Sequence, residues 1–174
     1  MEEMFCFQCQ QTAHNSGCEG RAGVCGKKSD TANYQDELTG ALIGLSRAVR
    51  KKLALNPDAS FEHADELILK GLFTTITNVN FFNDTIIKLI HEVNVEKDRI
   101  YPDIMNYDVR HIWEDQEDIR SLKSLILFGL RGMAAYAYHA YALDYVDKMS
   151  LISSMKGSKP LLRKRAVTNY LHSY

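Results

Sequence analysis

Residues 36–55 read DELTGALIGLSRAVRKKLAL, and this stretch decides the fold class. Its apolar residues recur at intervals of three and four positions, which is the period of one face of an α-helix. Such a stripe predicts a long amphipathic helix that buries one side against other helices. Asn56-Pro57-Asp58 follows and predicts a break. The residues of the stripe are Leu38, Ala41, Leu42, Leu45, Ala48, Val49 and Leu53.

Further helices are expected on both sides of the central one. Ser29 or Asp30 can cap its start, and Ser60 can cap the helix that follows. A third helix is expected to open at Asn83 or Asp84, and a fourth to run from Asp118 to about Leu143. Between them, from about 96 to 118, the pattern loosens around Pro102 and predicts a connection or short helices. No strand-like alternation of useful length is present, so the predicted class is all-α, a helix bundle with an N-terminal cysteine-rich loop.

The length and charge of the chain narrow the classes of partner. The chain has 174 residues and a formal net charge of -1, which gives no basic field for nucleic acid. No apolar stretch approaches the ~20 residues that a bilayer crossing needs. The acidic N-terminus lacks the apolar region of a secretory signal. We therefore expect no nucleic-acid or membrane partner and a cytoplasmic location.

All the cysteines of the chain lie in its first 25 residues. Cys6, Cys9, Cys18 and Cys25 form the pattern C-x2-C-x8-C-x6-C. Four thiols this close together indicate a metal site or a local disulfide knot. A reducing compartment disfavours the knot. Four thiolates suit either zinc or an iron–sulfur cluster, and the spacing alone leaves both open.

The residues between the cysteines are compatible with a cluster. Glycines recur through the loop, and glycine allows the backbone N–H groups to approach the sulfurs closely. Arg21, Lys27 and Lys28 would offset the negative charge of a cluster, although ordinary loop glycines and a solvated helix start explain the same residues. His14 is expected to be a surface residue, because four thiolates already complete a cluster.

Several sequence blocks resemble the hybrid cluster proteins, a family also called prismane or hydroxylamine reductase. The blocks occur in the family's order and at compatible spacing, and the resemblance runs from Met4 to about Tyr145. They are MFCFQCQQTA at 4–13, GC at 17–18, GVCGKK at 23–28, ANYQD at 32–36, GLFTTITNVN at 71–80, EDIRSLK at 117–123 and GLRGMAAY at 129–136.

The resemblance implies a helical N-terminal region that binds an iron–sulfur cluster through Cys6, Cys9, Cys18 and Cys25. The short loops resemble the branch of the family with a [4Fe–4S] cubane, whereas the branch with a longer second loop carries a [2Fe–2S] cluster. The gap before Cys25 is one residue longer than is usual in cubane members. We divide the chain into this loop at 1–28 and a helical bundle at 29–174, which together form one compact domain.

Complete members of the family are much longer and bind their hybrid cluster through His, Glu and Cys residues of later domains. This chain has no Cys after Cys25, so we expect no catalytic residues in it. The resemblance implies an electron-transfer module that relays electrons toward hydroxylamine or nitric oxide reduction, with a redox protein or the missing hybrid-cluster domain as partner. The alternatives are a zinc-stabilised interaction domain without redox activity and one subunit of a split oxidoreductase. Residues 146–174 match nothing recognised in the family.

Overall fold

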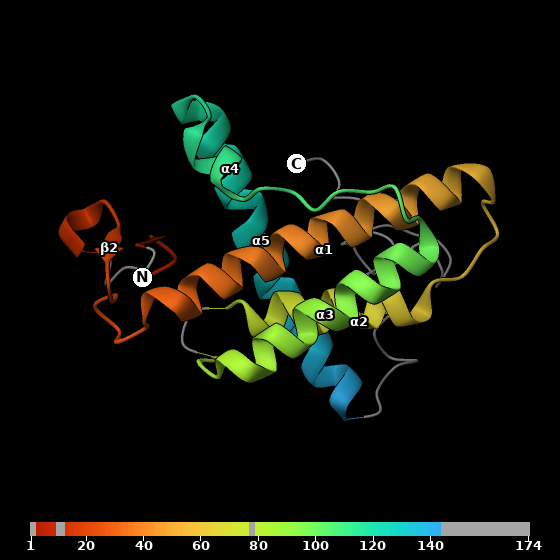
Figure 1. Cartoon of the computed structure of the whole chain (residues 1–174), viewed down its shortest axis with the longest axis horizontal. Coiled ribbons are helices and arrows are strands. Elements are labelled where there is room, and N and C mark those ends of the chain that lie inside the picture. Colours follow the sequence, from red (N-terminus) through yellow and green to blue (C-terminus); the bar gives the residue numbers. More distant parts are fainter. Residues whose placement is uncertain (1–2, 10–12, 77–78, 144–174) are drawn as a thin grey trace.

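The computed structural model describes residues 3–9, 13–76 and 79–143. Its described residues form five α-helices, one short 3-10 helix and a two-stranded sheet (Figure 1). The helical class predicted from the sequence is therefore confirmed. In chain order the elements are β1 (Met4–Cys6), the 3-10 helix η1 (Ala13–Asn15), β2 (Cys18–Gly20), α1 (Ser29–Leu55), α2 (Glu62–Thr74), α3 (Asn83–Ile100), α4 (Arg110–Glu114) and α5 (Glu117–Ala142).

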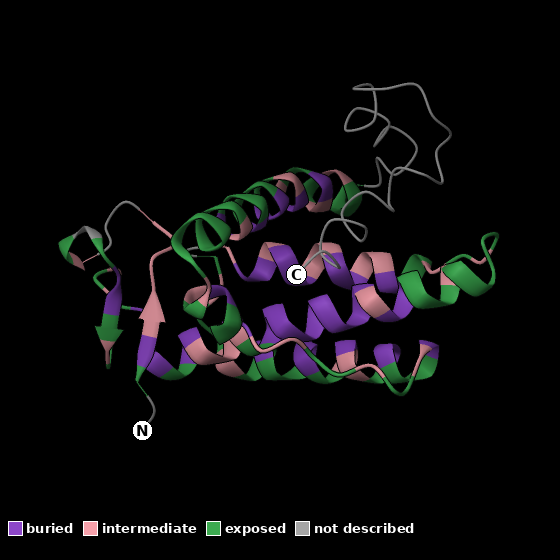
Figure 2. Ribbon diagram, turned by 90° about the horizontal axis from the view of Figure 1, so that it is seen from above, coloured by how far each residue is buried: buried purple, intermediate pink, exposed green. Residues whose placement is uncertain are grey.

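Helices α1, α2 and α3 pack against one another as a three-helix bundle, and α5 packs on α2. The long α1 runs the length of the bundle, and α5 crosses it steeply (Figure 1). The buried residues line the inner faces of these helices, while their outer faces are exposed (Figure 2). One end of α1 carries the cysteine-rich loop, so the bundle serves as the base on which the loop is mounted.

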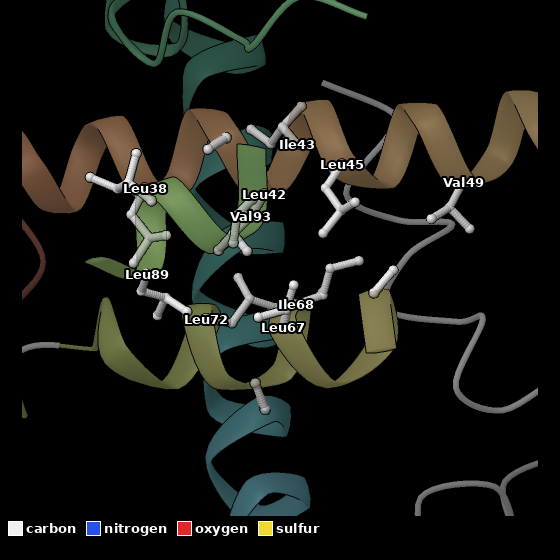
Figure 3. Close-up of a cluster of buried hydrophobic side chains, with 14 of the residues drawn as sticks. Leu38, Leu42, Ile43, Leu45, Val49, Leu67, Ile68, Leu72, Leu89 and Val93 are labelled. Carbon is white, nitrogen blue, oxygen red and sulfur yellow. The ribbon is translucent and has the colours of Figure 1, made fainter. Parts of the chain in front are cut away.

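The core of the bundle consists of leucine, isoleucine, valine and alanine side chains from all four long helices. Leu38, Leu42 and Leu45 of α1 are fully buried, as the apolar stripe predicts. Each such side chain stabilises the fold by about 1.5–3 kcal/mol relative to an exposed one. The labelled part of this core comprises Leu38, Leu42, Ile43, Leu45, Val49, Leu67, Ile68, Leu72, Leu89 and Val93 (Figure 3).

The helix boundaries differ from the predicted ones in small ways. Lys28 occupies the N-cap position of α1 and makes no side-chain capping bond, so the predicted capping by Ser29 or Asp30 is wrong by one or two residues. Likewise the N-cap residue of α2 is Phe61, not Ser60. Burial of an apolar helix face outweighs the preference for a capping side chain, which is worth about 1 kcal/mol.

Helix α3 continues to Ile100 through residues where the apolar pattern loosens. Two charged residues in its last turns are buried and find partners there. Glu96 accepts hydrogen bonds from Arg99, both at 2.7 Å, and Lys97 Nζ donates to Asn106 Oδ1 at 2.9 Å. These bonds allow two charged side chains to be buried at positions where a hydrophobicity pattern predicts an exposed helix face.

The segment 101–109 returns along α1 in close contact with its backbone. The Tyr107 N–H donates to the Gly40 carbonyl at 3.1 Å, and a Cβ atom at Gly40 would collide with the Tyr107 carbonyl oxygen. Asn106 also lies close to Gly44, one turn further along α1, where a Cβ atom would lie 2.8 Å from its Oδ1. The two glycines thus allow an extended segment to lie against the helix and to deliver α4 to the end that carries the cysteines.

No helix in the described part of the chain is both long enough and apolar enough to cross a bilayer. The stretch 146–174, in which no sequence block of the family is recognised, lies outside the described residues.

Candidate metal centre

The small sheet brings two of the four cysteines face to face. Strands β1 and β2 pair antiparallel, and the register places Cys6 opposite Cys18. Beneath the sheet, Met4 and Ala32 form a small buried cluster with Cys18, which fixes the sheet to the first turns of α1. The sequence analysis missed this sheet, because strands of three residues are too short to show an alternating pattern.

Cys25 reaches the same place through a tight turn around Gly23. A Cβ atom built on Gly23 would lie 3.7 Å from the Sγ of Cys18 and 3.7 Å from the Sγ of Cys25. The Val24 N–H points to Cys18 Sγ at 3.5 Å. Gly23 itself is held by its N–H bond to the Lys27 carbonyl at 2.8 Å. This turn therefore places both sulfurs within van der Waals distance of the position that a side chain at Gly23 would occupy.

The remaining cysteine, Cys9, follows β1 and is partly buried. All four cysteines are thiols, with no disulfide among them. Within residues 3–9, 13–76 and 79–143, no three His, Cys, Asp or Glu side chains are grouped closely enough to hold one metal ion. The structure thus brings the predicted ligands together in neighbouring pairs, Cys6 with Cys18 and Cys18 with Cys25, and does not close them into one set.

Burial raises the pKa of the Cys6 thiol. A backbone hydrogen bond from Gln8 and the charge of Lys27 oppose that shift, while Asp36 and Cys18 add to it. Without a metal the neutral thiol is therefore favoured at this position. Metal binding to such a thiol releases its proton, so metal affinity at this site is expected to rise with pH.

An aromatic cluster braces the strand that carries Cys6. The rings of Phe5 and Phe7, on either side of Cys6, lie 6.0 and 4.6 Å from the ring of Trp113 in edge-on arrangements. Phe5 and Phe7 also contact each other at 5.6 Å. Trp113 belongs to α4, so a residue more than a hundred positions away in the sequence packs against the residues on either side of Cys6. Sequence analysis gave no weight to it, and its one signal was that it is the only tryptophan of the chain.

A buried polar chain runs from the loop into the bundle. Lys27 Nζ donates to Gln35 Oε1 at 2.6 Å, and Gln35 Nε2 donates to the Asn80 carbonyl at 2.9 Å. Lys27 and Gln35 are both fully buried, whereas Lys28 next to them is exposed. The three loop cations considered from the sequence are thus not equivalent, since Arg21 is exposed as well.

A second buried cation lies further inside the same end of the bundle. Arg131 of α5 donates to Thr75 Oγ1 at 3.0 Å and to Thr39 Oγ1 at 3.1 Å, which ties α5 to α1 and α2. Burial raises the pKa of Asp36 to about 6, against the opposing charges of Arg131 and Lys27. Apart from Lys27, these polar residues were given no role from the sequence, because their burial results from packing between distant helices.

His14, the histidine of the loop, is a surface residue, as expected from the sequence. His14 is exposed and sits in the short 3-10 helix with a φ of 55°. It lies outside any metal-holding group among the described residues.

Comparison with known proteins finds relatives for most of the chain. A profile of the Prismane/CO dehydrogenase family matches residues 4–159, past the Tyr145 at which the recognised sequence blocks end. A hydroxylamine reductase of Desulfitobacterium hafniense (strain Y51) is 37% identical over 88% of this chain and 32% of its own length. The hydroxylamine reductase of Petrotoga mobilis is 38% identical over 93% of this chain and 36% of its own length.

A third relative gives the same picture. The hydroxylamine reductase of Bacteroides fragilis is 40% identical over 82% of this chain and 29% of its own length. The chain therefore spans about a third of the length of the curated relatives that it matches.

Proposed function

The chain belongs to the Prismane/CO dehydrogenase family, and from that premise we propose that it is an iron–sulfur electron-transfer module. Proteins of this family carry iron–sulfur clusters. The proposed ligands are Cys6, Cys9, Cys18 and Cys25, and the proposed cluster is a [4Fe–4S] cubane. Bound there, the cluster would supply one-electron redox chemistry.

The observation that carries the proposal is the convergence of thiols at the end of α1. The sheet register places Cys6 against Cys18, and the sulfurs of Cys18 and Cys25 both lie close to Gly23. Soft thiolate donors are those that iron–sulfur clusters take. Metal–thiolate bonds also supply free energy that gathers ligands into one set, so pairs of neighbouring thiols can serve as the starting arrangement for loading.

The other residues of the site support the same proposal by what they do to the thiolates. The Val24 N–H directed at Cys18 Sγ offers a hydrogen bond to a ligand sulfur, and such bonds tune the potential of a cluster. Met4 and Ala32 are buried beneath the sheet and exclude water from that side. The ring of Trp113 in α4 packs edge-on against Phe7, the residue that follows Cys6.

The reaction that consumes the electrons is proposed to take place elsewhere. The relatives named hydroxylamine reductase are about three times as long as the part this chain matches, and this chain has no Cys beyond Cys25. We therefore propose that the module passes electrons to a redox partner or to a hybrid-cluster domain where hydroxylamine or nitric oxide is reduced. Thiolate ligation of iron also favours a reducing compartment, for which we propose the cytoplasm.

The test is spectroscopy on protein reconstituted anaerobically with iron and sulfide. Wild type is expected to gain thiolate-to-iron absorption in the visible range and a paramagnetic signal after reduction by dithionite. Cys18→Ser should lose both, whereas Ser16→Ala, two residues away and exposed, should keep both. Wild type that binds only zinc and stays silent in electron paramagnetic resonance would contradict the proposal and favour a zinc-stabilised interaction domain.

A further inference from the structure

Two adjacent lysines at the end of the cysteine loop have opposite surroundings. Lys27 is 1% exposed, while Lys28 is exposed to solvent. Both residues lie directly after Cys25 and Gly26, and they share the same side-chain chemistry. The chain has therefore buried one of two neighbouring cations, and the burial of Lys27 needs a physical reason.

The partners of Lys27 in the protein are neutral. Its Nζ donates to Gln35 Oε1 at 2.6 Å and lies 6.0 Å from the centre of the Phe81 ring. The Gln35 amide is oriented for this role, because its Nε2 donates to the Asn80 carbonyl and leaves its oxygen for the lysine. None of the ion pairs among the described residues includes Lys27.

A buried cation without an ion pair is costly, and burial normally comes with a compensating negative charge. Asp36 supplies part of such charge, because the charge of Lys27 acts on its carboxyl, and the other nearby groups that can supply it are the thiols of the loop. Lys27 is two residues from Cys25, its carbonyl accepts the N–H of Gly23 between Cys18 and Cys25, and its charge acts on Cys6. A cluster held by four thiolates carries net negative charge, which these residues would place next to Lys27.

We propose that Lys27 is a positioning residue for the redox centre, the buried counter-charge of the iron–sulfur cluster held by the four cysteines. This inference rests on the proposed function and adds a determinant of the reduction potential. One electron from the donor enters the cluster, no bond to Lys27 forms or breaks, and the ammonium keeps its proton in both oxidation levels. Because the reduced cluster is one charge more negative, Lys27 stabilises the reduced level more than the oxidised level and raises the potential.

The experiment is a redox titration of the reconstituted full chain, followed by its visible absorption, in wild type and three variants. Lys27→Met should lower the equilibrium constant for reduction by about tenfold or more, which corresponds to about 59 mV for a one-electron couple. Lys28→Met, the matched control, should change it by less than about threefold, because water screens an exposed charge. Lys27→Arg should restore most of the wild-type value, since it keeps the charge. Equal shifts in Lys27→Met and Lys28→Met would overturn the proposal.

A fourth variant guards against a folding defect. Lys27→Gln removes the charge and keeps a hydrogen-bonding group on a slightly shorter side chain, so its potential should fall as that of Lys27→Met does. An unchanged potential in a Lys27→Gln protein that holds its full cluster would refute the role of Lys27. That outcome leaves the proposed function standing, whereas wild type without iron and sulfide removes both.

A readout that needs no cluster separates electrostatics from packing. In the metal-free chain Lys27→Met removes a buried charge, but it also removes the donor to Gln35 and the charge that acts on Asp36, so its thermal midpoint should fall only slightly. In the loaded and reduced protein the same substitution should lower the midpoint by more, because the charge that faces the cluster is lost as well. A midpoint that falls by the same amount in both states would mean that Lys27 acts only through packing and would overturn the proposal.

Discussion

Gly40→Ala is expected to destabilise the protein, although alanine is the better helix former. Gly40 lies inside α1, where glycine costs about 1 kcal/mol relative to alanine. Yet a Cβ atom there would collide with the backbone carbonyl of Tyr107, and backbone cannot rotate away as a side chain can. The same segment donates the Tyr107 N–H to the Gly40 carbonyl at 3.1 Å.

The magnitude follows from these terms. Overpacking of a filled site costs about 1–3 kcal/mol, and the weakened hydrogen bond about 0.5–1.5 kcal/mol. Subtracting the gain in helix propensity of about 1 kcal/mol leaves a net loss of about 0.5–3.5 kcal/mol. Gly129→Ala in α5 is the matched control, because nothing lies within 4 Å of a Cβ at that position. It should stabilise the chain by up to about 1 kcal/mol.

Urea denaturation followed by far-ultraviolet circular dichroism measures both changes. The emission of Trp113, the only tryptophan, reports whether the effect reaches the cysteine loop. The segment 101–109, which packs against Gly40, leads into α4. Displacement of this segment should therefore withdraw Trp113 from Phe7 and shift the Trp113 emission to longer wavelength. If Gly40→Ala stabilises the chain as much as Gly129→Ala does, the close approach of this segment to α1 is refuted.

Three further substitutions test the packing and the buried charges. Burial raises the pKa of Asp36 from 3.8 to about 6, so its contribution to stability is complete below about pH 4 and is lost as pH rises through about 6. The gain in unfolding free energy from Asp36→Asn should therefore grow by up to about 3 kcal/mol between about pH 4 and pH 7, and a gain independent of pH would contradict the shift. Arg131→Met should cost about 1–3 kcal/mol in denaturant unfolding, because the charge-assisted bonds that join three helices are lost; an unchanged midpoint would show that these bonds contribute nothing. Leu42→Ala should cost about 2–5 kcal/mol, whereas Leu125→Ala, at an exposed position of α5, should stay within about 0.5 kcal/mol, and similar losses for both would refute the assignment of the core.

The helices could be predicted from the sequence because their signal is local. The stripe from Leu38 to Val49 alternates at the helical period, and the structure buries that face in α1. The predicted opening of a helix at Asn83 is confirmed by α3, and the expected start at Asp118 lies one residue from that of α5. Each of these signals is contained in a window of a few turns.

The arrangement around the thiols could not be predicted, because it depends on contacts between distant residues. The residues around Cys6 give no sign that it lies opposite Cys18 in a two-stranded sheet, because each strand is only three residues long. A sequence pattern cannot distinguish Lys27 from Lys28. In the structure Lys27 is the buried one, and it donates to Gln35 of α1. The cysteine spacing thus predicts the ligands, while their surroundings come from the fold.

The identity of the bound metal tests the central claim most directly. The chain should be purified without oxygen and assayed for iron, zinc and acid-labile sulfide per polypeptide. Four thiolates around a cubane predict about four iron and four sulfide per chain, with little zinc. One zinc per chain with no sulfide would contradict an iron–sulfur centre at Cys6, Cys9, Cys18 and Cys25.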